Sequence, residues 1–285
     1  MSSARLGCQT YAWQMSGATY LGRLDHIIDV VGGSGFQGIE AEVQFLGALR
    51  DPVRMSEVLE RNKIALASAC IVEDWRGEKE TDAEREAGDW IIRYLSENFP
   101  DAVLNVCPMP GKDRRDLAER QSNQLTCMNA LARRAADQGV RAAYHPNSPA
   151  GSVCRIADDY DRMLNGLDDA VLKWVPDVGH IAKGGMDALG LMRKFRRLIA
   201  HVHFKDMGSD GAWKRMGEGS IDFEGVTRFL MDTGYDGWLI VEDESAEAEI
   251  DPDGVTKTDG VYLRKRIAPL FARSGEYAKA EFSRS

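Results

Sequence analysis

The stretch Ile199-Ala200-His201-Val202-His203-Phe204-Lys205-Asp206 combines the pattern of a buried strand with that of a binding site. Its apolar residues include β-branched and aromatic side chains, which are typical of a short strand. The two histidines are two positions apart, so both side chains point to the same face of that strand. A pair of imidazoles followed by a lysine and an aspartate indicates that this face opens on a functional site.

Seven further apolar, strand-like segments occur along the chain, and longer stretches with helical spacing separate them. The eight expected strands are Arg5–Thr10, Gln37–Ala41, Ala65–Ile71, Ala102–Val106, Val140–His145, Leu172–Asp177, Ile199–Phe204 and Trp238–Glu242. Residues 20–32 and 117–139 show apolar side chains at i, i+3 and i+4, which predicts amphipathic helices. Strands that alternate with helices indicate a parallel sheet. Eight such units favour closure into an α/β (β/α)8 TIM barrel.

An open Rossmann-like sheet is the alternative fold, and the sequence does not support it. That fold requires a GxGxxG turn after the first strand, and none is present. The glycine-rich segment 31–35 precedes a strand instead of following one. We therefore expect a single barrel domain over residues 1–273 and a C-terminal tail over 274–285. Residues 245–258 are acidic with one proline, and we expect a long loop there.

The composition of the 285-residue chain narrows its function class. The net charge is -9 and the sequence pI is about 5.2, whereas nucleic-acid binding requires a basic surface. We find no apolar run of about 18 residues for a membrane span and no signal-peptide pattern. An odd number of cysteines without a CxxC pair indicates reduced thiols and a cytoplasmic location. These cysteines are Cys8, Cys70, Cys107, Cys127 and Cys154.

Polar side chains lie at the carboxyl ends of the last four expected strands, where barrel enzymes carry their active sites. These residues are His145, Asp177, His203 and Glu242. Histidine and carboxylate together suit Mn²⁺, Co²⁺, Fe²⁺ or Zn²⁺ better than Ca²⁺. Of the two histidines in the quoted strand, His203 is nearer the rim and is the expected ligand, with His201 as inner support. We therefore predict a site for one divalent metal ion.

Three motifs in this half of the chain carry a family resemblance. They are Asp177-Val178-Gly179-His180, the stretch 201–206 quoted above, and Gly237-Trp238-Leu239-Ile240-Val241-Glu242. Over about residues 140–245 the chain resembles the xylose-isomerase-like barrels of the sugar phosphate isomerase/epimerase superfamily. The first half of the chain matches mainly in its alternation of strand-like and helical segments, with Gly38-Ile39-Glu40 as its most similar fragment. The resemblance implies Asp177, His203 and Glu242 as metal ligands and Mn²⁺ as the first choice of ion.

The chain departs from that family at the fifth strand, where the family usually supplies a glutamate ligand. Here the segment reads Ala142-Ala143-Tyr144-His145-Pro146-Asn147, with no carboxylate. In the similar 3-dehydroshikimate dehydratases the strand looks like Glu-x-His-Pro-Asn, with the histidine as base. Ala143 then replaces the ligand, and His145 is either the fourth ligand or a catalytic base. Inosose dehydratases and the barrel subunits of 3-oxo-C-glycoside-cleaving enzymes look similar here.

This departure favours a lyase or dehydratase over an epimerase. Ketose 3-epimerases of the superfamily resemble one another in pairing two metal-bound carboxylates, and that arrangement is missing here. Imidazole exchanges a proton near neutral pH. The resulting hypothesis is proton removal next to the carbonyl of a keto-sugar or keto-polyol, followed by β-elimination. His145 acts as base, His180 protonates the leaving oxygen or orients the substrate, and Lys205 adds positive charge near the enolate oxygen.

Three further side chains are candidates for substrate contacts. Arg215, in the loop 213–219, is expected at the far end of the substrate, Glu40 at its hydroxyls and Trp13 against the sugar ring. Each also has a purely structural interpretation: Arg215 as a surface charge, Glu40 in a salt bridge and Trp13 in the core. The substrate itself is expected to be a small sugar or polyol.

Two other functions remain open at this point. One is a metal-dependent epimerase or aldose–ketose isomerase, which would exchange the substrate proton in D₂O without losing water. The other is a non-catalytic barrel subunit, since some relatives work with a second, smaller chain. The superfamily also contains endonuclease-like barrels, which the acidic charge disfavours. Barrels of this type are often homo-oligomers, so a homo-oligomer is also an expectation.

Overall fold

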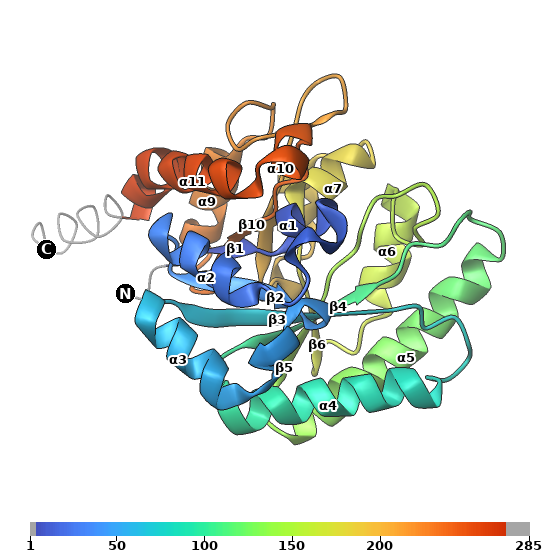
Figure 1. Cartoon of the computed structure of the whole chain (residues 1–285). Coiled ribbons are helices and arrows are strands. Elements are labelled where there is room, and N and C mark those ends of the chain that lie inside the picture. Colours follow the sequence, from blue (N-terminus) through green and yellow to red (C-terminus); the bar gives the residue numbers. More distant parts are fainter. Residues whose placement is uncertain (1–3, 272–285) are drawn as a thin grey trace, which may run out of the picture.

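Eight parallel strands form the centre of the molecule in the computed structural model, which describes residues 4–271 (Figure 1). They are β1 (Arg5–Gln9), β2 (Gly38–Glu42), β3 (Ala65–Glu73), β4 (Val103–Pro108), β5 (Arg141–Tyr144), β6 (Leu172–Trp174), β7 (Val202–Phe204) and β10 (Trp238–Val241). Their order in the sheet is β6-β5-β4-β3-β2-β1-β10-β7. The tail expected at 274–285 lies outside the described residues, as do residues 272 and 273.

The sheet closes between β6 and β7, its two outermost strands. Closure uses two isolated parallel bridges, Trp174 with Ile199 and Asp177 with His203. The amide of His203 donates to the carbonyl of Pro176 at 2.9 Å. The (β/α)8 barrel expected from the sequence is therefore confirmed.

All eight expected strands are present, with ends that differ by a few residues. The largest differences are at β6 and β7, which are three residues each instead of six. These two strands meet at the closing seam, where isolated bridges replace a continuous ladder. A further pair, β8 (Asp206–Met207) and β9 (Trp213–Lys214), forms a small antiparallel hairpin after β7.

Helices cover the outside of the barrel. They are α1 (Tyr11–Met15), α2 (Leu24–Gly33), α3 (Pro52–Asn62), α4 (Asp82–Asn98), α5 (Leu117–Asp137), α6 (Ala157–Asn165), α7 (Val178–Lys183), α8 (Ala188–Lys194), α9 (Phe223–Asp232), α10 (Ala246–Ile250) and α11 (Pro252–Tyr262). Helix α2 buries Leu24, Ile27, Ile28 and Val31 at the spacing that the sequence predicted. The apolar face of each such helix packs on the strands and so positions their carboxyl ends.

The prediction of a long loop at 245–258 is wrong, because this segment folds as α10 and α11. The Ser245 side chain accepts a hydrogen bond from the amide of Ala248 at 3.2 Å and begins α10. Asp251 accepts from the amide of Gly254 at 2.9 Å, and Pro252 occupies the first turn of α11. Ser and Asp caps and an N-terminal proline are strong helix starts. The high polarity of the segment concealed these signals.

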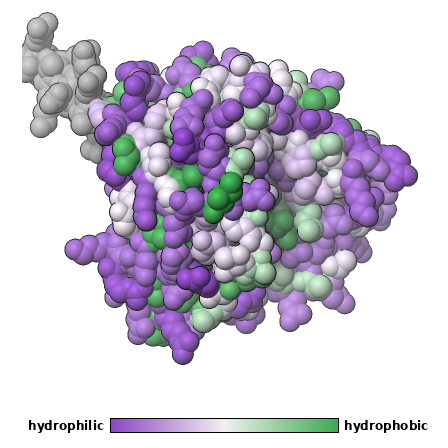
Figure 2. Space-filling model, turned by 45° about the horizontal axis from the view of Figure 1, so that its top comes forward, coloured by the Kyte–Doolittle hydropathy of each residue, from purple (hydrophilic) through white to green (hydrophobic). Residues whose placement is uncertain are grey.

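The surface is mostly hydrophilic and the cysteines are unpaired, and neither feature points to a particular function. Figure 2 shows a face on which hydrophilic residues predominate and hydrophobic residues occur mostly in small groups. Within the described residues, no helix is both long and apolar enough to span a membrane. All five cysteines lie in this region and none forms a disulfide.

Candidate metal centre and active-site cavity

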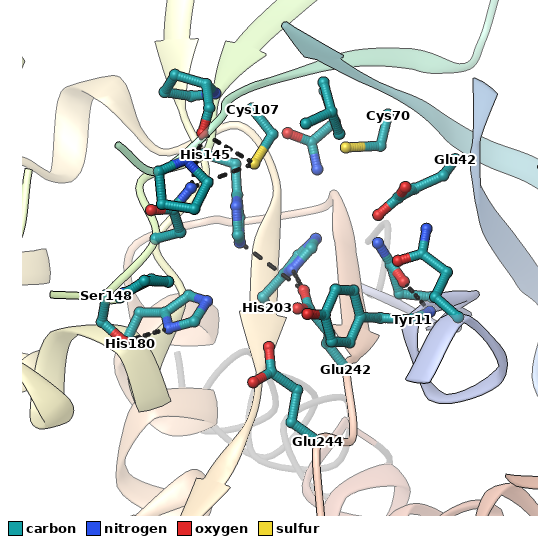
Figure 3. Close-up of a pocket in the computed structure, with 18 of the residues that line it drawn as sticks. Tyr11, Glu42, Cys70, Cys107, His145, Ser148, His180, His203, Glu242 and Glu244 are labelled. Atoms are coloured by element: carbon teal, nitrogen blue, oxygen red, sulfur yellow. Dashed lines mark hydrogen bonds and ion pairs between the residues drawn. The ribbon is translucent and has the colours of Figure 1, made fainter. Parts of the chain in front are cut away.

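A cavity of about 310 Å³ opens at the carboxyl ends of the strands. Its wall carries imidazoles, carboxylates and amides alongside prolines, cysteines and aromatic rings (Figure 3). The polar lining includes His145, His180, His203, Glu42, Glu242, Glu244, Gln9, Gln14, Gln44, Asn105 and Asn147. A cavity of this size and lining suits a small polar ligand.

Four side chains predicted from the strand ends come together at the floor of this cavity. His145, Asp177, His203 and Glu242 each offer one ligand atom, and these atoms all lie within 4.8 Å of one another. His145 Nε2 is 3.7 Å from Asp177 Oδ2 and 3.8 Å from Glu242 Oε2. His203 Nδ1 is 2.6 Å from Glu242 Oε2. Adjacent barrel strands thus place two imidazoles and two carboxylates around one point.

This cluster fits a divalent metal ion. His145 Nε2 and Asp177 Oδ2 are buried and have no hydrogen-bond partner among the described residues. Buried polar atoms left unpaired are costly and uncommon in folded proteins. A cation at the centre of the four atoms would satisfy both. Nitrogen and oxygen donors together suit Mn²⁺, Co²⁺, Fe²⁺ or Zn²⁺.

Glu40 lies beneath the cluster and does not line the cavity, contrary to its expected contact with substrate hydroxyls. Its Oε1 is 3.1 Å from His203 Nε2, on the far side of the ring from Glu242. Its carboxylate also lies 2.9 Å from His201 Nε2 and accepts from Asn105 Nδ2 at 2.8 Å. A carboxylate behind a ligand histidine fixes the ring and raises its basicity. Glu40 is therefore placed to orient the ring of His203, and His201 lies on the inner side of the site beside Glu40.

Opposing charges shift the pKa values of the buried His203 and Glu40. Burial lowers the pKa of His203, but Glu40 and Glu242 outweigh it and raise the pKa to about 9. Burial raises the pKa of Glu40, yet His203 and His201 hold it well below the usual range. The pair therefore carries opposite charges near neutral pH when no metal is bound.

Lys205 is fully buried beside the metal cluster and does not pair with Asp206 at the rim. Its Nζ donates to Glu242 Oε1 at 2.6 Å and to Glu244 Oε1 at 2.5 Å. It also lies 2.9 Å from His180 Nε2. Burial lowers the pKa of Lys205, but Glu242 and Glu244 raise it well above its usual value. Lys205 is thus a permanent positive charge within the site.

His180 is held between two partners on the wall of the cavity. Its Nδ1 is 2.8 Å from Ser148 Oγ, and its Nε2 faces the ammonium group of Lys205. Because an ammonium group can only donate, Nε2 carries a lone pair and the ring proton is on Nδ1. Burial lowers the pKa of His180 to about 3, although Asp177 opposes this shift. His180 is therefore a neutral imidazole.

Two of the expected substrate contacts lie away from the cavity. Trp13 is completely buried and its Nε1 donates to Asp253 Oδ1 at 2.7 Å, so it belongs to the core. Arg215 is one third exposed and pairs with Glu218 at 2.5 Å. Trp213 lines the cavity instead, with its ring 5.5 Å from that of His180. The tryptophan available to a substrate is thus the one on β9.

Several cavity residues were missed in the sequence, and a regular signal would have identified some of them. Glu42 follows Glu40 by two residues, and Glu244 follows Glu242 by two. Side chains two apart on a strand point the same way, so the outer member of each pair reaches the rim. Gln9 is the last residue of β1, but it carries no charge. Gln14 on α1 and Gln44 in the short helical turn 43–45 carry no such signal, because they follow the strands instead of ending them.

Comparison with known proteins agrees with this architecture. Residues 28–266 match the family model described as xylose isomerase-like TIM barrel. The chain belongs to the xylose isomerase-like TIM barrel family. The resemblance noted in the sequence is therefore confirmed, although the match does not specify the reaction.

Relatives and structural neighbours of this family member include enzymes. The chain is 28% identical over 157 residues to an inosose dehydratase of Clostridium beijerinckii, covering 49% of this chain and 52% of that protein. The chain thus spans about half the length of the curated relatives it matches. The apo 3-keto-D-glucoside 4-epimerase YcjR of E. coli has TM-score 0.72 and 18% identity, covering 92% and 100% of the two chains. The IolI protein with a bound zinc atom has TM-score 0.73 and 13% identity, covering 93% and 98%. Identities this low show the shared fold alone.

Proposed function

We propose that this chain is a divalent-metal-dependent lyase or dehydratase acting on a keto-sugar or keto-polyol. The reaction would remove the proton next to the carbonyl and eliminate a β-hydroxyl as water. The observation that carries this proposal is the group of four ligand atoms beside a neutral imidazole and a buried ammonium. A bound divalent ion would polarise the carbonyl and stabilise the charge that develops there.

The geometry favours His145 as the fourth ligand instead of the base. Its Nε2 lies within the ligand cluster at distances similar to those between the other donors, and it has no competing partner. The alanine at position 143, where the family usually has a glutamate, leaves room for this imidazole. The role of base then passes to His180, whose ring lines the same cavity and whose Nε2 is unprotonated.

His180 and Lys205 form a functional pair in this proposal. His180 Nε2 would exchange its hydrogen bond with Lys205 for the α-hydrogen of the substrate. Ser148 holds the other ring nitrogen and so keeps the required tautomer. Lys205 would stabilise negative charge on the substrate because it stays protonated between two carboxylates. These residues would remove the proton and stabilise the charge without the pair of metal-bound carboxylates that the ketose 3-epimerases use.

The lining of the cavity supports a neutral, hydroxylated substrate. Five amide side chains offer both donors and acceptors, which match sugar hydroxyls. The only lysine or arginine among the lining residues is Lys183, since Lys205 is fully buried and does not line the cavity. A phosphorylated or carboxylated substrate would call for a guanidinium or several lysines. The name of the Clostridium relative, inosose dehydratase, is consistent with a neutral keto-polyol.

Metal analysis combined with two histidine variants tests this function. Purified protein should hold about one divalent ion per chain and convert an inosose or a 3-keto-D-glucoside with loss of water or of the glycoside group. His145→Ala should lose the metal, whereas His180→Ala should keep it and lose exchange of the α-hydrogen in D₂O. Exchange in the wild type without any elimination would instead show an epimerase. Turnover that persists without metal would reject the proposal.

A further inference from the structure

An elimination needs a proton for its leaving oxygen, and before the α-proton is taken the donors on the metal side of the cavity are all paired. The three N–H bonds of Lys205 are matched by three acceptors, Glu242, Glu244 and His180. The single ring proton of His180 is directed at Ser148. A donor that is separate from the group taking the α-proton would therefore lie on another wall of the cavity.

Glu42 lies on that other wall. It is the last residue of β2, is 5% exposed and lines the cavity. Figure 3 shows its carboxyl group facing the cavity from the side opposite His145 and His180. It lies nearer the rim than Glu40, on the same face of β2, and forms no ion pair within the described part of the chain. No other described carboxyl group lines the cavity without a lysine or histidine partner.

Glu42 has one close polar partner, and no cation faces it. Gln44 Nε2 donates to its Oε2 at 2.6 Å, which leaves Oε1 free to carry a proton. The titratable groups that face it are Tyr11 on α1, Cys70 on β3, Cys107 on β4 and Glu242 on β10. None of them brings a positive charge.

Burial and neighbouring charge shift the titration of Glu42 in the same direction. Burial raises the pKa of Glu42 to about 7; Gln44 and Gln14 oppose this rise, and the charges of Cys107 and Glu242 add to it. A pKa near the working pH is the optimum for a group that both gives and regains a proton. This agrees with the geometry.

We propose that Glu42 is the general acid of the elimination. Its carboxylic acid donates a proton to the leaving hydroxyl as the carbon–oxygen bond breaks, and water departs. His180 then releases the α-proton to solvent, and Glu42 takes up a proton from solvent, which restores both groups for the next turnover. This inference rests on the proposed function, since it requires an elimination at the same site.

The variant Glu42→Gln tests the proposal, because glutamine keeps the shape and cannot give the proton. We expect kcat with an inosose to fall by roughly 100-fold or more, since acid catalysis contributes about 10²- to 10⁴-fold. KM and α-hydrogen exchange in D₂O should stay near wild type, because His180 is intact. Glu73→Gln, at the end of the neighbouring strand β3 and outside the cavity, is the matched control.

A fluorinated substrate separates an acid from a merely structural residue. Fluoride leaves without a proton, so an analogue with fluorine at the leaving position should restore the rate of Glu42→Gln towards wild type. No restoration would overturn the proposal, as would loss of α-hydrogen exchange, which would make Glu42 the base. Unchanged kcat in Glu42→Gln, or an equal loss in Tyr11→Phe, would also overturn it.

The pH profile gives an independent readout. Glu42 must be protonated to act, so wild-type kcat should fall as pH rises through about 7, and Glu42→Gln should lack that decline. Infrared difference spectra between pH 6 and 8 should show a protonated carboxyl signal in wild-type protein that is missing in Glu42→Gln, with or without metal. A wild type that shows this carboxyl signal but no elimination would reject the proposed function alone.

Discussion

The contacts behind His203 decide how firmly the metal is held. Glu40 lies 3.1 Å from the ring nitrogen that faces away from the cavity, while Glu242 lies at the other nitrogen. We expect Glu40→Gln to weaken affinity for Zn²⁺ or Mn²⁺ by about 10- to 100-fold, the usual effect of removing such a carboxylate. Competition with a coloured chelator measures this. Glu42→Gln should leave affinity unchanged, and equal affinity in both variants would contradict the role of Glu40.

The two tryptophans numbered 13 and 213 should respond in opposite ways to replacement by alanine. Trp13→Ala removes a completely buried side chain and should lower the free energy of unfolding by about 3–5 kcal/mol. Trp213→Ala should leave that free energy nearly unchanged and raise KM several-fold, because this ring lines the cavity. Urea denaturation and steady-state kinetics distinguish them. A change in KM without loss of stability in Trp13→Ala would contradict the assignment.

The sequence predicted the residues whose direction follows from strand register alone. His145, Asp177, His203 and Glu242 end consecutive strands, so closure of the barrel was enough to bring them together. The depth of a side chain below the rim was not predictable in the same way. Glu40 is buried under the cluster whereas Glu42, one step further along the same face, reaches the cavity.

At the scale of elements, capping side chains explain the helices that follow the last strand. Asp251 accepts from the amide of Gly254 and begins α11. We expect Asp251→Ala to lower the free energy of unfolding by about 1 kcal/mol, the usual loss of an N-cap. Chemical denaturation compares it with Asp236→Ala, an exposed aspartate outside any helix. Equal stability of the two variants would show that tertiary contacts, not the cap, hold α11 in place.

The eight strands and the main helices could be predicted because alternating periodicity is a strong local signal. Residues 245–258 were not recognised as helices, because the segment is polar and short and its caps act together with packing contacts on other elements. Asp253 on α11 illustrates this, since it accepts from Trp13 on α1 and lies 2.8 Å from His26 on α2. Contacts between segments more than 200 residues apart leave no local pattern.

At the scale of the whole molecule, bound metal should stabilise the fold. An ion present at about 100 times its Kd adds roughly 2.7 kcal/mol to the free energy of unfolding. Chelation by EDTA should therefore lower the Tm by several degrees, and added Zn²⁺ or Mn²⁺ should restore it. Differential scanning calorimetry measures the shift. Asp177→Ala should show no response to either treatment, and a metal-dependent Tm in this variant would contradict the ligand assignment.

The closing seam of the barrel gives the metal a mechanical consequence. Asp177 and His203, two of the four ligands, are also the partners of one of the isolated bridges that join β6 to β7. An ion bound by both residues would cross-link β6 and β7, where the hydrogen-bond ladder of the sheet is least continuous. Without it, backbone amides along this joint should exchange hydrogen with solvent faster than those between β3 and β4, where the ladder is continuous. Chemistry and barrel integrity would then depend on the same few atoms.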